Sequence, residues 1–208
     1  MTTPARRLVA AGYDRIADAY LDRFGVSAVR RKWFDHLVES LPTNGARVLD
    51  LGCGAGIPIA RDLAALGHSV LGVDGSAEQV ARARHNVPAA MFLEADMCEV
   101  ELDGGSFDAA GAFYSITHVP AAEQGALLAK IARWLRPGGM LVASFGAGPA
   151  GDWTGEWLGT TMFFGHGGED ATLASLGDAG LIVRRSQIER QDNEDAVFLW
   201  VAAVKATS

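Results

Sequence analysis

The feature that most constrains the fold is a short apolar strand that runs directly into three alternating glycines. Residues 47–51 read Arg-Val-Leu-Asp-Leu, and Gly52, Gly54 and Gly56 follow at once. Glycine permits positive φ angles and lets the backbone approach a ligand with no Cβ in the way. A strand, a glycine turn and a helix in this order are typical of nucleotide-binding α/β proteins, although the glycines alone would be weak evidence.

Apolar strands and amphipathic helices alternate along the rest of the chain, which predicts parallel strands joined by crossover helices. We expect helices over residues 4–24 and 26–41 at the start of the chain. The expected strands of the parallel sheet are residues 47–51, 69–73, 90–93, 107–113 and 140–145. The last two strands, 181–189 and 196–204, are separated by a short polar connection that requires an antiparallel hairpin.

Length and composition predict one soluble domain over residues 1–208. The chain is 49% hydrophobic and 21% charged, and its formal net charge is −7. A negative balance argues against nucleic acid as a partner, because such surfaces need clustered Lys and Arg. Cys53 and Cys98 fit neither a disulfide framework nor a metal site, and no apolar run is long enough to span a membrane. We therefore expect a cytoplasmic monomer or homodimer with no metal and no membrane partner.

Two acidic residues lie at the carboxyl ends of the first two strands. Asp50 emerges at the carboxyl end of the first strand, where its charge disfavours a pyrophosphate and suits a ligand that carries an amino group. Asp74 ends the second strand, where an acid can accept hydrogen bonds from both ribose hydroxyls. Because NAD-binding proteins place an acid similarly, Asp74 indicates a nucleoside without choosing between cofactors.

The pattern Asp-x-Gly-Cys-Gly-x-Gly over residues 50–56 resembles the first motif of the class I S-adenosylmethionine-dependent methyltransferases. Arg136-Pro137-Gly138-Gly139 is similar to a later landmark of that family. The resemblance covers nearly the whole chain. It implies an α/β fold with a Rossmann-like seven-stranded sheet of order 3-2-1-4-5-7-6, its last strand antiparallel, flanked by helices. It also implies S-adenosylmethionine as cofactor and S-adenosylhomocysteine as product.

The resemblance further implies where the cofactor would lie. The glycine turn would wrap its methionine portion, and Asp96 would accept from the adenine amine beside the backbone of Met97. The cofactor-binding residues implied in this way are Tyr13, Asp50, Gly52, Cys53, Gly54, Gly56, Pro58, Asp74, Gly75, Ser76, Asp96, Met97 and Phe113.

Two segments are expected to close over the site. Residues 1–41 resemble the helical lid of relatives with a Tyr-Asp-x-Ile-Ala-x-x-Tyr pattern, and residues 146–168 have the length and apolar content of a substrate-side loop. The candidate acceptor-binding residues are all aromatic: Tyr20, Tyr114, Trp153, Trp157, Phe163 and Phe164. His118 and His166 are the candidate catalytic residues, because histidine titrates near neutral pH and can act as a general base.

The resulting hypothesis is methyl transfer to a small, apolar or aromatic metabolite, with O-methylation preferred and N-, S- and C-methylation open. An NAD(P)-dependent oxidoreductase is the first alternative, but it predicts a GxGxxG spacing and a last parallel crossover. A non-catalytic cofactor-binding module is the second, disfavoured because Asp50, Asp74 and Asp96 are all present.

Overall fold

The computed structural model describes residues 2–192 and 194–207; Asn193, in the turn of the expected terminal hairpin, and both end residues lie outside this part. The helices are α1 (Pro4–Phe24), α2 (Ala28–Glu39), α3 (Ile59–Ala65), α4 (Ala77–Asn86), α5 (Ala121–Trp134) and α6 (Glu169–Asp178), with a 3₁₀ helix η1 (Ile116–His118). The strands are β1 (Arg47–Leu51), β2 (Ser69–Asp74), β3 (Met91–Glu94), β4 (Phe107–Ala112), β5 (Leu135–Gly146), β6 (Gly151–Trp157), β7 (Thr160–His166), β8 (Leu181–Arg190) and β9 (Val197–Lys205).

Seven of these strands form one sheet of order β3-β2-β1-β4-β5-β9-β8. The strands β1 to β5 are parallel to one another, whereas β9 is antiparallel to both β5 and β8. The fold class predicted from the sequence is therefore confirmed, including the reversed last strand. The carboxyl ends of the parallel strands meet at one edge of the sheet, which is where ligands of such folds bind.

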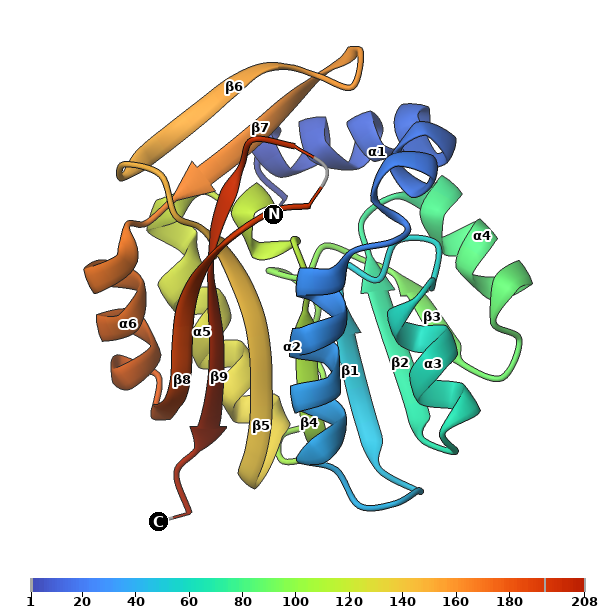
Figure 1. Ribbon diagram of the computed structural model, residues 1–208, viewed down its shortest axis with the longest axis vertical. Coiled ribbons are helices and arrows are strands. Elements are labelled where there is room, and N and C mark those ends of the chain that lie inside the picture. Colours follow the sequence, from blue (N-terminus) through green and yellow to red (C-terminus); the bar gives the residue numbers. More distant parts are fainter. Residues whose placement is uncertain (1, 193, 208) are drawn as a thin grey trace.

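Helices cover both faces of the sheet, as Figure 1 shows. The alternation of side chains along β1 explains this arrangement, because successive residues of a strand point to opposite faces. Leu49 and Leu51 pack in one apolar cluster with Leu127 and Ile131 of α5. Val48 packs in a second cluster that includes residues of α2, α3 and α4.

The segment 146–168 is not the loop that we expected. Its centre forms an antiparallel hairpin in which β6 pairs with β7 residue by residue. In β6, Trp153, Gly155 and Trp157 alternate with polar residues, which is the period of a strand. The connection at Leu158 and Gly159 has positive φ angles of 50° and 77°, as tight hairpin turns require.

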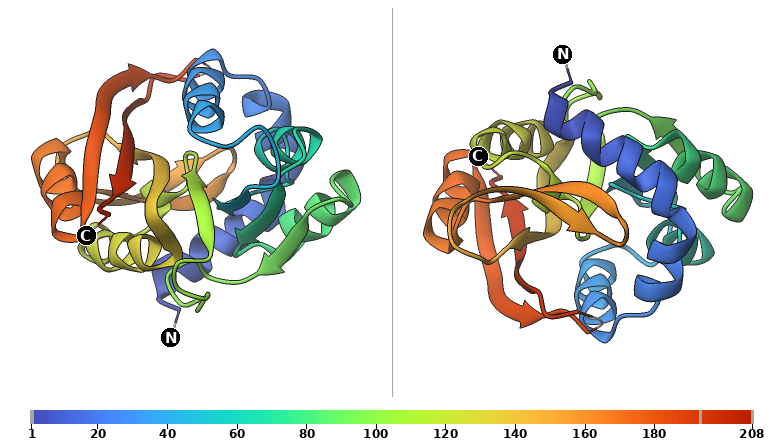
Figure 2. Two further views of the ribbon diagram at one scale, coloured as in Figure 1. Left: turned by 90° about the horizontal axis from the view of Figure 1, so that it is seen from below. Right: turned by 90° about the horizontal axis from the view of Figure 1, so that it is seen from above.

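The helix α1 and the β6–β7 hairpin lie side by side over the carboxyl edge of the sheet (Figure 2). Gly12 explains how closely they approach, because a Cβ there would lie 2.7 Å from the sulfur of Met162 on β7. Glycine inside a helix costs about 1 kcal/mol relative to alanine. At Gly12 the absence of a side chain allows α1 to pack directly against the hairpin.

No helix in the described part of the chain is long and apolar enough to cross a membrane.

Candidate active site

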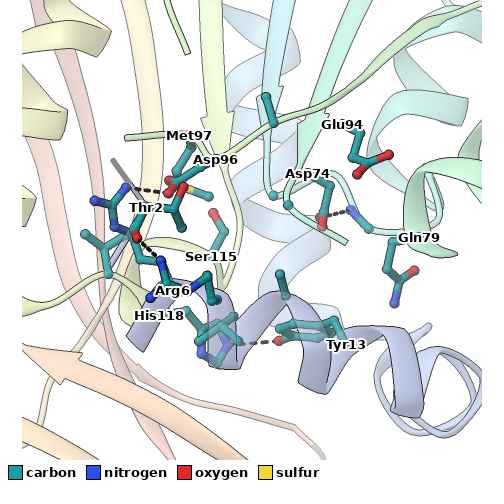
Figure 3. Close-up of a pocket in the computed structure, with 18 of the residues that line it drawn as sticks. Thr2, Arg6, Tyr13, Asp74, Gln79, Glu94, Asp96, Met97, Ser115 and His118 are labelled. Carbon is teal, nitrogen blue, oxygen red and sulfur yellow. Dashed lines mark hydrogen bonds and ion pairs between the residues drawn. The ribbon is translucent and has the colours of Figure 1, made fainter. Parts of the chain in front are cut away.

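A cavity of about 370 Å³ lies at the carboxyl ends of the parallel strands, with α1 forming one wall (Figure 3). Its volume is within the range of cofactor and small-molecule sites. The predicted cofactor residues that line it are Tyr13, Gly52, Gly54, Asp74, Gly75, Asp96, Met97 and Phe113. The predicted cofactor residues that do not line it are Asp50, Cys53, Gly56, Pro58 and Ser76.

The glycine turn brings the backbone close to the loop after β4. Gly52 has a φ angle of 71°, and a Cβ there would lie 2.3 Å from the Cβ of Ser115. Gly54 donates its backbone N–H to Oδ2 of Asp74 over 2.9 Å. Only glycine fits at residue 52, because any side chain would meet both backbone strain and a clash.

Asp74 lies at the centre of the cavity wall. Its two carboxylate oxygens accept the backbone N–H groups of Gly54 and Ser76, each over 2.9 Å. Burial raises the pKa of Asp74 above its usual value, while these two hydrogen bonds act in the opposite direction. A carboxylate has about four acceptor sites, so Asp74 can still accept from a ligand hydroxyl.

Asp50 lies behind this wall and is only 2% exposed. Burial raises the pKa of Asp50 to about 7, and the charge of Asp74 adds to this effect. Its Oδ2 atom is buried without a hydrogen-bond partner. Asp50 does not line the cavity, so the structure does not place its carboxylate against a ligand there, and burial without a donor favours its neutral form.

Asp96 lies at the far end of the cavity and already has two partners. It accepts the backbone N–H of Cys98 over 2.9 Å and forms an ion pair with Arg6 of α1. Arg6 also lies 3.1 Å from carboxylate oxygens of both Glu99 and Glu123. The N-terminal helix is therefore attached by a charge cluster to the predicted adenine end of the site.

Further along α1, two more acids attach this helix to α4. Asp14 accepts from the hydroxyl of Ser76 over 2.6 Å, and Asp18 pairs with Arg82. The helix α1 is thus attached near its start and along its middle, and its inner face carries Tyr13 and Tyr20 into the cavity.

Tyr13 and His118 meet on the cavity wall. The hydroxyl oxygen of Tyr13 lies 2.9 Å from Nε2 of His118, and Nδ1 of the same ring lies 2.8 Å from the backbone oxygen of Phe163. A carbonyl oxygen can only accept, so Nδ1 carries the proton and Nε2 accepts from Tyr13. Burial lowers the pKa of His118 to about 4, which makes the ring neutral at physiological pH.

Aromatic rings surround this pair. Trp157 lies 6.3 Å from the Tyr13 ring and is stacked on Phe24 at 5.7 Å between ring centroids. Phe164 lies 4.7 Å from the His118 ring. Among the predicted acceptor-binding residues, only Tyr20 and Tyr114 line the cavity itself. Trp153, Trp157 and Phe164 of the hairpin form an outer aromatic layer beside α1 and η1. Phe163 is buried at the neighbouring position of β7, where side chains point to the opposite face of the strand.

His166 lies away from the cavity, in contrast to His118. Its ring packs against Gly146 and Gly148, where added Cβ atoms would lie 2.2 and 2.7 Å from ring atoms. Burial lowers the pKa of His166. These contacts make His166 a packing residue between the hairpin and the end of β5.

Arg6, Gln79 and Glu94 are among the polar residues of the cavity wall that sequence reasoning did not assign to the site. Gln79 fits a helix-capping pattern, and its backbone N–H does bond to the Ser76 hydroxyl over 3.1 Å. Its side-chain nitrogen, however, is buried without a partner at the cavity. Glu94 stands opposite Asp74 in the β2–β3 register, so strand pairing is the signal that could have identified it.

The residues of the cavity fit an adenosyl sulfonium ligand. Such a ligand presents an ammonium group, sugar hydroxyls and an adenine amine, all of which are donors. Asp74, Glu94 and Asp96 provide acceptors along the wall, and the rings of Tyr13 and Phe113 provide faces that favour a cation. The fold and this site define a Rossmann-like nucleoside-binding domain of the methyltransferase type.

Comparison with known proteins identifies a methyltransferase domain within the chain. Residues 48–139 match the family model of a methyltransferase domain. The chain is 32% identical to 27-O-demethylrifamycin SV methyltransferase of Amycolatopsis mediterranei, over 68% of this chain and 59% of that protein. It is 36% identical to ubiquinone biosynthesis O-methyltransferase of Xanthomonas oryzae pv. oryzae, over 53% of this chain and 47% of that protein. The chain thus spans about half the length of these curated relatives.

A solved structure supports the same fold. The 1,6-didemethyltoxoflavin-N1-methyltransferase of Burkholderia thailandensis, with its substrate and S-adenosylhomocysteine bound, aligns with a TM-score of 0.73 at 22% identity. The alignment covers 94% of this chain and 84% of that one. Residues 48–139 therefore contain a methyltransferase domain, and the described chain has the fold of the class I S-adenosylmethionine-dependent methyltransferases.

Proposed function

We propose that this chain transfers the methyl group of S-adenosylmethionine to a hydroxyl oxygen of a small apolar or aromatic metabolite. The observation that carries the proposal is the state of His118. Its Nε2 atom carries no proton, lies on the cavity wall and already accepts a hydrogen bond from a hydroxyl, that of Tyr13.

The cofactor would lie along the acids of the wall. Asp74 and Glu94 would accept from the sugar hydroxyls, and Asp96 from the adenine amine, with the backbone of Met97 beside the ring. The backbone of Gly52 and Gly54 would pass close to the methionine portion. When bound, S-adenosylmethionine supplies a methyl group activated by the sulfonium charge, so the protein contributes position, a dry site and proton removal.

His118 would take the proton of the acceptor. Because burial holds its pKa near 4, the ring is neutral at physiological pH and Nε2 is available as a base. An oxygen that gains a methyl group becomes far more acidic than an imidazolium, so a weak base is sufficient. An acceptor hydroxyl that displaced Tyr13 from Nε2 would form the same hydrogen bond.

The surroundings favour an apolar acceptor. Tyr20, Tyr114 and Phe113 line the cavity near His118, and Trp157 and Phe164 form the next layer. Large aromatic side chains provide apolar contact area for a flat ligand. The names of both curated relatives also refer to oxygen methylation. The toxoflavin enzyme is named for nitrogen methylation, so the acceptor atom must be tested directly.

A set of acceptors with one shape and different reacting groups provides this test. We would incubate the protein with S-adenosylmethionine and 2-naphthol, 2-naphthylamine, 2-naphthalenethiol or 2-naphthoic acid, and measure S-adenosylhomocysteine release. We expect turnover with the hydroxyl compound, and loss of that turnover in His118→Gln. Turnover with only the amine, thiol or acid would contradict the proposal, as would cofactor binding without turnover on any of the four.

A further inference from the structure

The β6–β7 hairpin is tied to the segment that carries His118 by three hydrogen bonds. Nδ1 of His118 bonds to the Phe163 oxygen over 2.8 Å. The side chain of Gln124 on α5 donates to the Gly165 oxygen over 3.0 Å. The backbone N–H of Ala121, at the start of α5, donates to the Asp152 carboxylate over 3.0 Å. Residues of both hairpin strands are therefore held against the turn between η1 and α5.

Gln124 is the centre of this connection. Its side chain is 5% exposed, and its amide nitrogen also lies 3.0 Å from the Val119 oxygen and 3.4 Å from the Ile116 oxygen. Ile116 and Val119 flank His118 in the sequence. One buried amide group thus holds the backbone on both sides of His118 and the hairpin strand that faces the ring.

Gly165 shows how close this contact is. A Cβ at this residue would lie 2.3 Å from the Val119 oxygen and 2.9 Å from the Ala121 nitrogen. The hairpin strand therefore runs against the turn with no room for a side chain. A small displacement of β7 would move the Phe163 oxygen away from His118, because Phe163 lies on the same short strand as Gly165.

The hydrogen bond from Nδ1 to the Phe163 oxygen determines which ring nitrogen of His118 carries the proton. With the Phe163 oxygen in place, the proton stays on Nδ1 and Nε2 is an acceptor. Without that oxygen, a neutral imidazole can carry its proton on either nitrogen. A proton on Nε2 would remove the lone pair that faces Tyr13 and the cavity.

We infer that Gln124 is a positioning residue, which docks the β6–β7 hairpin so that the Phe163 carbonyl holds His118 in its Nδ1–H tautomer. Asp152 is the second tie of the same hairpin. This inference deepens the proposed function and rests on it for its catalytic meaning, but the tautomer is a property of the protein alone. It makes the hairpin a part of the proton-accepting apparatus as well as an aromatic wall.

The test is the tautomer of His118 in ¹⁵N-histidine-labelled protein, read from long-range ¹H–¹⁵N spectra at pH 7 and assigned with His118→Gln. We expect Nδ1–H in the native chain. In Gln124→Met, which keeps the side-chain length but removes the donor, we expect a mixture that includes Nε2–H. Asp152→Ala should give the same direction of change to a smaller extent, and it remains informative if Gln124→Met does not fold. Gln187→Met, on the exposed face of β8, is the matched control and should leave the spectrum unchanged.

Each result has a distinct meaning. An Nε2–H tautomer in the native chain would overturn the inference. So would an unchanged Nδ1–H tautomer in folded Gln124→Met and folded Asp152→Ala. If the spectra behave as expected but 2-naphthol is not methylated, the proposed function fails and the positioning role stands. Where methylation is measurable, Gln124→Met should lower kcat about tenfold or more with unchanged S-adenosylhomocysteine affinity, because the base is misoriented while the cofactor wall is intact.

Discussion

The Tyr13 hydroxyl and the Nε2 atom of His118, 2.9 Å apart, join the first helix of the chain to the turn after β4. The two residues are 105 positions apart in the sequence. Both residues line the cavity. The same helix therefore touches both the proposed proton acceptor and the proposed adenine end of the site.

Replacement of Tyr13 by phenylalanine tests this contact. We expect Tyr13→Phe to lower the free energy of unfolding by about 1 kcal/mol, the usual net value of one hydrogen bond. The ring packing against Tyr20 and His118 should remain, because phenylalanine keeps the ring. Chemical denaturation measures the effect, and a variant as stable as the native chain would show that the hydroxyl contributes nothing. Tyr20→Phe is a suitable comparison because it changes the neighbouring ring on the same helix.

The buried His118 predicts a specific acid response. Its folded-state pKa of about 4 lies below its ordinary value of 6.5, so the unfolded chain binds more protons between these values. Stability should therefore fall as pH decreases from about 6.5 to about 4, and His118 should contribute about 3 kcal/mol of this loss. Asp50, whose raised pKa acts in the opposite direction over an overlapping range, makes the total curve unsuitable for the test.

The measurement is thus a difference between variants. Unfolding free energies of the native chain and of His118→Gln at pH 7 and pH 4 should show a shallower loss in the variant by that amount. His85→Gln, an exposed histidine on α4, should follow the native curve. Parallel curves for the native chain and His118→Gln would contradict the assigned protonation state.

Removal of the Asp74 carboxylate should weaken cofactor binding. We expect Asp74→Ala to raise the dissociation constant of S-adenosylhomocysteine by about 10- to 100-fold, because hydrogen bonds to charged groups contribute about 1.5–3 kcal/mol. Calorimetry measures the affinity. Circular dichroism checks that the variant still folds without the hydrogen bond from the glycine turn to Asp74. An unchanged affinity in a folded variant would remove Asp74 from the cofactor site.

The charge cluster around Arg6 should control how firmly α1 covers the cavity. Arg6→Met keeps the side-chain bulk but releases Asp96, Glu99 and Glu123. We expect faster dissociation of S-adenosylhomocysteine by several-fold, measured by stopped-flow fluorescence. Arg23→Met, at an exposed position of α1 that does not line the cavity, is the control. Equal dissociation rates for the two variants would show that the cluster does not hold the helix closed.

Gly45 and Gly52 have similar backbone angles, so replacing each by alanine distinguishes the cost of backbone strain from the cost of a steric clash. Gly45 and Gly52 have φ angles of 75° and 71°, but a Cβ at Gly45 would meet nothing within 4 Å. Gly45→Ala should therefore cost about 1 kcal/mol, the strain alone. Gly52→Ala should cost clearly more, because its Cβ would collide with Ser115. Thermal denaturation measures both, and equal losses would show that the turn can shift away from the loop after β4.

Local patterns in the sequence were sufficient for the sheet. The apolar residues of β1, the glycine turn and the short polar link between β8 and β9 each specify structure over a few residues, and the observed strand order agrees. The β6–β7 hairpin was not foreseen because its strands contain glycine at residues 155 and 165, which the sequence presents as loop-like. The alternation of tryptophan and polar residues in β6 was the available signal.

The site was harder to predict from the sequence, because its contacts join residues that are far apart in the chain. Arg6 reaches Asp96 across 90 positions, and nothing around Arg6 distinguishes it from an ordinary basic residue near a helix start. Gln79 fits a helix-capping pattern, so nothing in the sequence indicated that its side chain also lines the cavity. Gln124 is one residue of an amphipathic helix, and only the docked hairpin shows which carbonyls it reaches.

The position of Thr2 on the cavity wall has a practical consequence for experiments. Affinity tags or fusion partners placed before this residue would emerge beside Asp96 and Arg6, where they could obstruct ligand entry. The other end of the chain follows β9 and lies at the opposite edge of the sheet (Figure 1). Recombinant protein for ligand titrations should therefore carry its purification handle at the C-terminus.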